Sequence, residues 1–268
     1  MKSIDKEHAE RSYKYNYTLT PSGMGATRAN LLRILRSNDL VSWSSREESG
    51  RLDRKAFTRY ACGDANIFSK REVREAELSA VSIMIDCSGS MSYGGEIGLA
   101  GQVAVQLCKI FDKANAEFSV TGFYGGDDAQ IQSATGASRD IAVRVERPVF
   151  IPFKKWGESL GKASAKLGAI SQCAQGSTPD YSSIALALED LAIRKEPRKI
   201  LFLLTDANGY NQAHMKYLQQ LADKQRITLI AIGIGHTEVA QCFTHAENVT
   251  NIQDLTSASL NKVLKVLK

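Results

Sequence analysis

The side chains best suited to chemistry lie between residues 81 and 91, where an apolar run ends at a carboxylate. The run is broken only by Ser82 and stops at Asp86, and two hydroxyls follow at alternate positions, Ser88 and Ser90. In open α/β sheets, ligands bind at the carboxyl ends of the strands. Clustered oxygen donors of this kind suit a hard cation such as Mg²⁺, which prefers oxygen ligands in near-octahedral geometry. The sequence therefore predicts a cation site at the end of a buried strand.

Two later positions are expected to complete the ligand set. Thr178 lies in the segment Gly-Ser-Thr-Pro-Asp, just before a helical pattern, and Asp206 directly follows the almost unbroken apolar run 199–205. Such a run is typical of a central parallel strand that is covered on both faces. If this strand lies beside the strand that ends at Asp86, both carboxylates emerge at one edge of the sheet. The five residues would then surround one ion, with water completing the octahedron.

An alternative interpretation of the first motif is structural. Taken alone, Asp86, Ser88 and Ser90 are equally compatible with a turn whose hydroxyls cap a helix. The addition of Thr-Pro before a helix and of an Asp after an apolar strand, in that order along the chain, strongly favours the metal site.

The elements that position these residues alternate between strand and helix from residue 79 onward. Strand patterns are predicted at 81–86, 117–124, 199–205, 227–234 and 248–252, and helical patterns at 97–111, 184–191, 212–224 and 260–267. Strands separated by helical patterns of this length favour βαβ units. We therefore predict an α/β fold with a doubly wound, mostly parallel sheet flanked by helices.

Two regions depart from the alternation. Residues 1–78 are interpreted as a small N-terminal, largely helical extension that packs on the main domain of residues 79–268. Residues 126–177 carry only weak signals and are interpreted as an insertion in that domain. The weak signals in the insertion are a strand at 141–145 and a helix at 160–170.

Within the extension, local patterns give four expectations. Helices are predicted at 28–36 and 52–60, a Ser-rich connection carrying Trp43 at 39–50, and a solvated mixed-charge segment at 70–77. The alternating Tyr13, Tyr15 and Tyr17 predict a short strand or an ordered arm whose rings serve packing.

Composition narrows the function classes. The net charge of +5 is a mild excess, whereas nucleic-acid binders usually carry a basic face or stripe. Five widely spaced cysteines without a CxxC pair argue against a disulfide framework and against thiolate metal sites. The first residues lack the apolar core of a signal peptide, and no apolar run approaches the length of a membrane span. We expect a cytoplasmic protein without membrane contact.

Other motifs with catalytic potential are incomplete. Residues 157–163 resemble a phosphate loop, but three residues separate the glycines where four are needed, and Ala163 stands where a hydroxyl should bind Mg²⁺. The four histidines form no metal-binding pair, and we interpret His236 as a loop or capping residue. Cys87 has no recognisable base and is interpreted as a small buried thiol. We therefore predict no catalytic residues and assign any ATP chemistry to a partner.

The pattern of Asp86-Cys-Ser-Gly-Ser90 with Thr178 and Asp206 resembles the metal-ion-dependent adhesion site (MIDAS) of von Willebrand factor A (VWA) domains. In that family, the hydroxyls and one Asp ligate Mg²⁺ directly or through water, and a partner's carboxylate often fills an open position. The resemblance covers about residues 79–268. It implies Mg²⁺ as the metal, with Mn²⁺ or Ca²⁺ as alternatives, and a protein ligand that carries a carboxylate.

A closer resemblance is to the carboxy-terminal region of the CobT subunit of aerobic cobaltochelatase. It rests on Ser42-Trp43 with the segment 50–53 and Phe68, on the segment 229–236, and on the stretch 251–255. One departure is Cys87, which stands where that family more often has Asn.

The CobT resemblance implies partners and two alternative functions. CobT pairs with an AAA+ ATPase ring (CobS), and related modules pair with MoxR-type ATPases. The first hypothesis is a Mg²⁺-dependent, protein-binding module that is not catalytic by itself and recruits substrates to such a ring, in a phage or mobile-element setting as one option. The alternative is a cobaltochelatase subunit that takes part in ATP-driven cobalt insertion into a corrin ring. An extracellular adhesin is disfavoured because no export signal is recognised.

Overall fold

The main body of the protein is a six-stranded sheet. The computed structural model describes residues 5–19, 25, 29, 41–63, 65–73, 79–126, 147–235 and 239–255. The strand order is β6-β5-β4-β7-β8-β9, and every neighbouring pair is parallel except β5 and β6. The strands are β4 (Ser79–Asp86), β5 (Glu117–Gly125), β6 (Pro148–Lys154), β7 (Arg198–Thr205), β8 (Ile227–Ile234) and β9 (Ala246–Val249).

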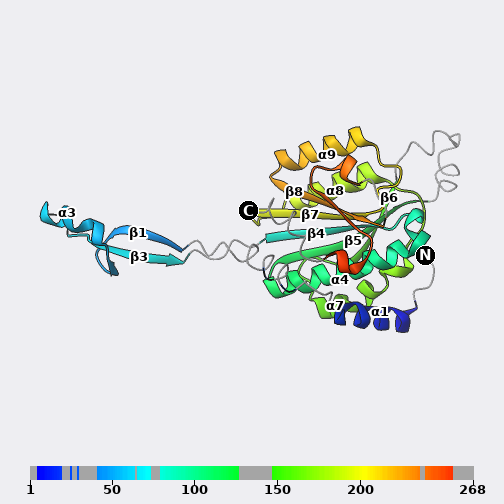
Figure 1. Ribbon diagram of the computed structural model, residues 1–268, viewed down its shortest axis with the longest axis horizontal. Helices are drawn as coiled ribbons and strands as arrows, with labels where there is room; N and C mark the ends of the chain where they lie inside the picture. The colour runs from blue at the N-terminus through cyan, green and yellow to red at the C-terminus, as the bar shows by residue number, and fades with distance from the viewer. Residues whose placement is uncertain are drawn as a thin grey trace.

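Helices cover both faces of this sheet. One face carries α8 and α9, and the other carries α4 and α7 with α1 outside them (Figure 1). The helices of the main body are α4 (Glu96–Ala114), α7 (Leu160–Gly168), α8 (Asp180–Ala192), α9 (Gln212–Lys224) and α10 (Val239–Cys242). Three 3₁₀ turns accompany them: η2 (Gly89–Gly95), η3 (Ile170–Gln172) and η4 (Ile252–Leu255). The predicted doubly wound, mostly parallel α/β fold is confirmed.

Strand β4 shows why the sequence folds in this way. All eight of its residues are buried, because helices pack on both of its faces. Val81, Ile83 and Ile85 belong to the core shared with α4, whereas Ala80 and Met84 belong to the core shared with α8. This alternation explains the continuous apolar run before Asp86.

The interval read as an insertion contributes to the main sheet from residue 148 onward. β6 pairs antiparallel with β5 and forms one edge of the sheet, and α7 follows it. Pro148 and Pro152 interrupt the usual strand pattern, and proline is tolerated at a strand's start and on edge strands. For this reason no strand was predicted at 148–154, and the strand expected at 141–145 lies outside the described residues.

The tyrosine-rich N-terminal segment is a helix, α1 (Lys6–Thr18), and the expectation of a strand or arm was wrong. Asp5 caps it by accepting hydrogen bonds from the backbone N–H groups of Glu7 and His8. Residues four apart share one side of a helix, so the Tyr13 and Tyr17 rings lie together, with centroids 5.7 Å apart. Both rings pack against the core, while Tyr15 is exposed.

Helix α1 lies against α7 and α4. The Gln106 side chain of α4 donates hydrogen bonds to the backbone oxygens of Asn16 (2.6 Å) and Leu19 (3.0 Å). Lys109 donates to the backbone oxygen of Tyr17 (2.8 Å). The two side chains thereby cap α1, because they donate hydrogen bonds to carbonyl groups at its C-terminal end that lack partners within the helix.

A second, three-stranded sheet forms within residues 41–73, with strand order β1-β3-β2. Its strands are β1 (Val41–Glu47), β2 (Arg51–Leu52) and β3 (Phe68–Val73), and η1 (Arg54–Ala56) and α3 (Phe57–Ala61) lie between β2 and β3. The predicted Ser-rich connection is thus partly a strand, the predicted helix at 52–60 is much shorter, and the solvated segment begins as β3. Pairing between β1 and β3, which are distant in sequence, decides these outcomes.

Some expectations lie outside the described residues. These are the helix at 260–267, the role of His236 and the helix at 28–36, of which the structure describes Ala29 alone. Among the described helices, none combines the length and the apolar character needed to cross a membrane.

Candidate metal centre

Asp86 ends β4 as a fully buried carboxylate that organises the following turn. Its Oδ1 accepts a hydrogen bond from the backbone N–H of Ser88 (2.9 Å). This bond folds the chain so that the Ser88 and Ser90 hydroxyl oxygens lie 3.0 Å apart. Ser88 is buried and Ser90 is half-buried. The first three predicted ligands therefore form one hydrogen-bonded group at the carboxyl end of the strand.

Two residues that the sequence analysis did not select hold the other oxygen of Asp86. Thr205, the last residue of β7, donates a hydrogen bond to Oδ2 (2.9 Å). The Tyr210 hydroxyl donates to the same oxygen (3.2 Å) and lies 2.9 Å from the Thr205 hydroxyl. The position of Thr205 at the end of the neighbouring apolar strand was a usable signal. Tyr210 offered none, because the turn after β7 brings it back.

The loop that carries Thr178 is fastened to the same turn. Backbone hydrogen bonds run from Gly89 to Gly176 (3.0 Å) and from Gln175 to Cys87 (2.8 Å), and Gly125 of β5 donates to Ser177 (2.6 Å). Gly176 has a φ of +70°, and a Cβ there would collide with the carbonyl oxygen of Gly125. A glycine is therefore required at this close approach. Half-buried Thr178 follows, and α8 begins at Asp180.

Asp206 lies half-buried just after β7, and its Oδ1 accepts a hydrogen bond from the backbone N–H of Asn208 (3.0 Å). The pKa of Asp86 is raised to about 6, mainly by burial and also by the charge of Asp206, while hydrogen bonds from Ser88 and Thr205 oppose the shift. The two carboxylates are thus close enough to repel each other. They come from adjacent parallel strands, as the sequence analysis expected.

The donor set fits a hard divalent cation. In the described part of the chain, the groups that act on Asp86 are Ser88, Thr205, Tyr210 and Asp206, so the buried carboxylate gains no charge compensation from a described Lys or Arg. Burying an uncompensated charge is costly. Within the described residues, no three His, Cys, Asp or Glu side chains gather as metal ligands, so the Ser and Thr hydroxyls must complete any such site. Oxygen-only ligation suits Mg²⁺, Mn²⁺ or Ca²⁺.

Cys87, between Asp86 and Ser88, is not exposed to this edge. It is fully buried, and burial raises the pKa of its thiol well above the usual value. A Cβ on Gly122 would lie 2.7 Å from the Cys87 sulfur, so the glycine in β5 leaves the space that the thiol fills. The interpretation of Cys87 as a small buried thiol is confirmed.

Comparison with solved structures defines the class of fold. BatB from Bacteroides thetaiotaomicron is similar in structure, with a TM-score of 0.51 at 12% identity, over 70% of this chain and 98% of that one. The family model described as the cobalamin biosynthesis protein CobT VWA domain matches residues 67–268. The chain therefore belongs to the CobT family of VWA domains, as its motifs indicated.

Two further structures are more distant. Manganese-loaded TRAP protein from Plasmodium vivax has a TM-score of 0.42 at 14% identity, and the match covers 72% of each chain. Proximal thread matrix protein 1 from the mussel byssus, with zinc in its MIDAS motif, has a TM-score of 0.45 at 18% identity, over 70% of this chain and 45% of that one. A search among curated proteins found no match.

Proposed function

We propose that this VWA domain binds Mg²⁺ through Asp86, Ser88, Ser90, Thr178 and Asp206 and thereby captures a carboxylate of a protein partner. The observation that carries the proposal is the pair of neutral hydroxyls, 3.0 Å apart, beside a buried carboxylate that has no basic neighbour among the described residues. Neutral hydroxyl ligands leave much of the charge of a divalent ion uncompensated. An ion held in this way would offer a Lewis-acidic attachment point for an incoming Asp or Glu.

The protein's own residues prepare this site before any ligand arrives. Thr205 and Tyr210 fix the Asp86 carboxylate, and the bonds from residues 87 and 89 to residues 175 and 176 hold the Thr178 loop against it. Such pre-organisation lowers the entropic cost of binding. We infer a binding role, because the described edge offers no general base or phosphate loop for chemistry.

The first test measures metal binding directly. Thr178→Ala removes one predicted hydroxyl from a half-buried loop position, and Ser177→Ala, at the exposed neighbouring position, is the matched control. Titration with Mn²⁺, followed by electron paramagnetic resonance, should show weaker binding for Thr178→Ala and unchanged binding for Ser177→Ala. A saturating ion at 100 times its Kd should stabilise the wild type by about 2.7 kcal/mol. Equal metal affinity in Thr178→Ala and wild type would contradict the ligand assignment.

We further propose that the partner belongs to an AAA+ ATPase ring of the CobS or MoxR type, and that the domain recruits substrates to it. This step rests on membership of the CobT family. Binding to a purified ring of this type, measured by biolayer interferometry, should require Mg²⁺ and be lost in EDTA and in Thr178→Ala. Binding that persists in EDTA would rule out the carboxylate-capture mechanism.

The family also favours a second candidate, a subunit of a cobaltochelatase. Only the second function yields a chemical product, a corrin ring that contains cobalt. If this chain replaces CobT in a mixture of the ATPase and the large chelatase subunit, cobalt appearing in the corrin ring would establish the second candidate. ATPase binding without cobalt insertion would favour recruitment.

A further inference from the structure

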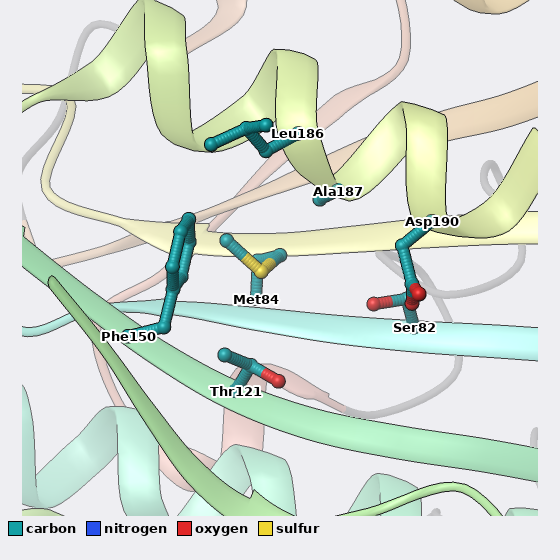
Figure 2. A pocket seen from close by; sticks show the side chains of 7 residues that line it. All are labelled: Ser82, Met84, Thr121, Phe150, Leu186, Ala187 and Asp190. Atoms are coloured by element: carbon teal, nitrogen blue, oxygen red, sulfur yellow. The ribbon is translucent and has the colours of Figure 1, made fainter. Parts of the chain in front are cut away.

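The face of the main sheet that carries α8 and α9 has a groove at its β6 side. On this face, α8 packs on β4 and β7, and α9 packs on β8. Beside α8, a cavity of about 170 Å³ opens over β4 and β5. Figure 2 shows Ser82, Met84 and Thr121 on its floor, Phe150 of β6 at one side, and Leu186 and Asp190 of α8 above.

The size of the groove indicates what it can hold. Pockets for cofactors and drug-sized ligands usually measure about 300–1,000 Å³. An engineered apolar cavity of about 150 Å³ binds benzene. The groove therefore matches a single aromatic ring or one long aliphatic side chain.

Two of the surrounding residues are apolar yet exposed. Phe150 is 37% exposed and Leu186 is 45% exposed. Ile193, seven residues after Leu186 on the same side of the helix, is 83% exposed and follows directly after α8. Aromatic and aliphatic side chains that line a pocket beside an exposed apolar strip are typical of protein-binding sites.

Among the described residues that line the groove, the ionised one, Asp190, is acidic. Asp190 is exposed at the surface, and its Oδ2 accepts a hydrogen bond from the Trp156 indole (2.9 Å), which fixes the carboxylate beside the groove. The nearby Arg194 is bound to Glu196 by two hydrogen bonds, of 3.0 and 2.5 Å. Arg194 also acts electrostatically on Asp190, but its hydrogen bonds go to Glu196, so the exposed Asp190 carboxylate can still pair with a positive group on a partner.

We propose that this groove docks a protein partner through one large apolar side chain, aromatic or long aliphatic, that has a Lys or Arg next to it. The apolar side chain fills the space between Phe150 and Leu186, and the basic group pairs with Asp190. The proposal does not depend on the metal centre. Phe150, at one side of the groove, lies level with Asp86 across the sheet, because Phe150 pairs with Phe123 and Phe123 pairs with Asp86.

The test selects peptides from a random displayed library on the full chain, in EDTA so that metal-bound carboxylates cannot contribute. The enriched peptides should share an aromatic or long aliphatic residue adjacent to Lys or Arg. Leu186→Arg and Asp190→Lys should each weaken binding of a synthetic, fluorescein-labelled peptide of this consensus at least about tenfold, as expected of hot-spot residues.

Matched variants control for surface charge. Tyr15→Arg makes the same kind of change at an exposed residue of α1, on the opposite face, and Glu189→Lys reverses the charge next to Asp190 outside the groove lining. Both should bind the consensus peptide like the wild type. Circular dichroism should show all four variants folded, since each site is exposed.

Three results would overturn the proposal. These are a library without the apolar–basic pair, equal binding by Leu186→Arg and wild type, and equal losses in the control variants. Self-association that Leu186→Arg abolishes, seen by sedimentation velocity, would assign the groove to a second copy of this chain instead. Because the selection is made without metal, its failure leaves the metal proposal to be judged by Mn²⁺ titration alone.

Discussion

The two faces of the main sheet are built differently. On the face of α4, the neighbouring helices approach so closely that α7 presents a glycine, Gly168, to the backbone of Ala9 in α1. On the face of α8, the helix buries one side and leaves the other beside a groove. A closely packed face stabilises the fold but presents little surface to a partner. Our two proposals accordingly place recognition on the α8 face and at the carboxyl edge from which α8 starts.

The difference between a packed side and an open side should be measurable within the single helix α8. Leu188 is fully buried between the helix and the sheet, whereas Leu186 is 45% exposed. Leu188→Ala should lower the free energy of unfolding by about 2–5 kcal/mol, because it removes buried methyl groups and leaves a cavity. Leu186→Ala should change it by less than about 0.5 kcal/mol. Urea denaturation measures both, and similar losses would mean that the outer side of α8 is covered.

The opposite face should be sensitive to added atoms. Gly168→Ala places a Cβ against the backbone oxygen of Ala9, so we expect a loss of about 1–3 kcal/mol from overpacking. Gly161→Ala, in the same helix, meets no atom within 4 Å and should stabilise by up to about 1 kcal/mol through helix propensity. Thermal unfolding distinguishes them. Equal shifts for both variants would show that α1 does not pack closely on α7.

At the carboxyl edge of the sheet, the free energy of unfolding should depend on the hydrogen bonds to Asp86. Thr205→Val keeps the shape but removes a 2.9 Å donor to a buried carboxylate, and we expect a loss of about 1–3 kcal/mol. Tyr210→Phe leaves the Thr205 donor in place and removes the longer, 3.2 Å bond to Asp86 together with the contact to the Thr205 hydroxyl, so it should cost less. Denaturation in metal-free buffer gives both values. The reverse order would identify Tyr210 as the main support of the carboxylate.

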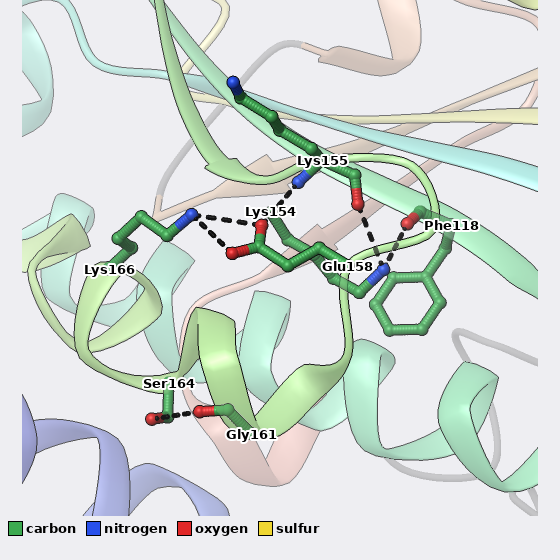
Figure 3. A network of polar contacts seen from close by, with 7 residues as sticks. All are labelled: Phe118, Lys154, Lys155, Glu158, Gly161, Ser164 and Lys166. Atoms are coloured by element: carbon green, nitrogen blue, oxygen red, sulfur yellow. Dashed lines mark hydrogen bonds and ion pairs between the residues drawn. The ribbon is translucent and has the colours of Figure 1, made fainter.

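The smallest effect should come from the polar network that joins β6 to α7. Lys166 binds Glu158 (2.8 Å), and the neighbouring Lys154 donates to the backbone oxygen of Phe118 (2.6 Å; Figure 3). The hydrogen bond from Lys166 lowers the pKa of the Glu158 carboxyl. Since this pair is partly exposed, Glu158→Gln should cost less than about 1 kcal/mol at pH 7.

The pH dependence of this pair has a definite sign. A carboxyl with a lowered folded-state pKa contributes its stability above the unfolded value of about 4.3, and the contribution disappears as the pH falls through the folded-state pKa. The difference between wild type and Glu158→Gln, measured by urea denaturation, should therefore vanish at low pH. Glu189→Gln, at an exposed site on α8, serves as the control. A difference that grows in acid would contradict the ion pair.

The sequence patterns correctly predicted those strands and helices whose spacing of apolar residues corresponds to the sides that are buried. Strands β4, β7 and β8 carry near-continuous apolar runs because helices cover both of their faces. Where pairing with distant segments decides the outcome, the patterns failed. The serines of β1 become a strand only through β3, and the prolines of β6 are tolerated only because β6 lies at an edge. The alternation of the three tyrosines of α1 predicted a strand or an arm, whereas packing on α7 and α4, which partly buries Tyr13 and Tyr17, favours the helix.

The sequence by itself determined the residue types of the candidate metal centre and the order in which they occur. Short motifs of this kind can be read because each lies where an apolar strand ends or a helix begins. Only the tertiary structure decided which groups hold Asp86 in place, how the Thr178 loop is fastened, and that a groove opens beside α8. These features depend on residues that are far apart along the chain, such as Asp86 and Tyr210, which share a hydrogen bond, and Met84 and Leu186, which line one groove. No local pattern records such contacts, since packing alone brings the residues together.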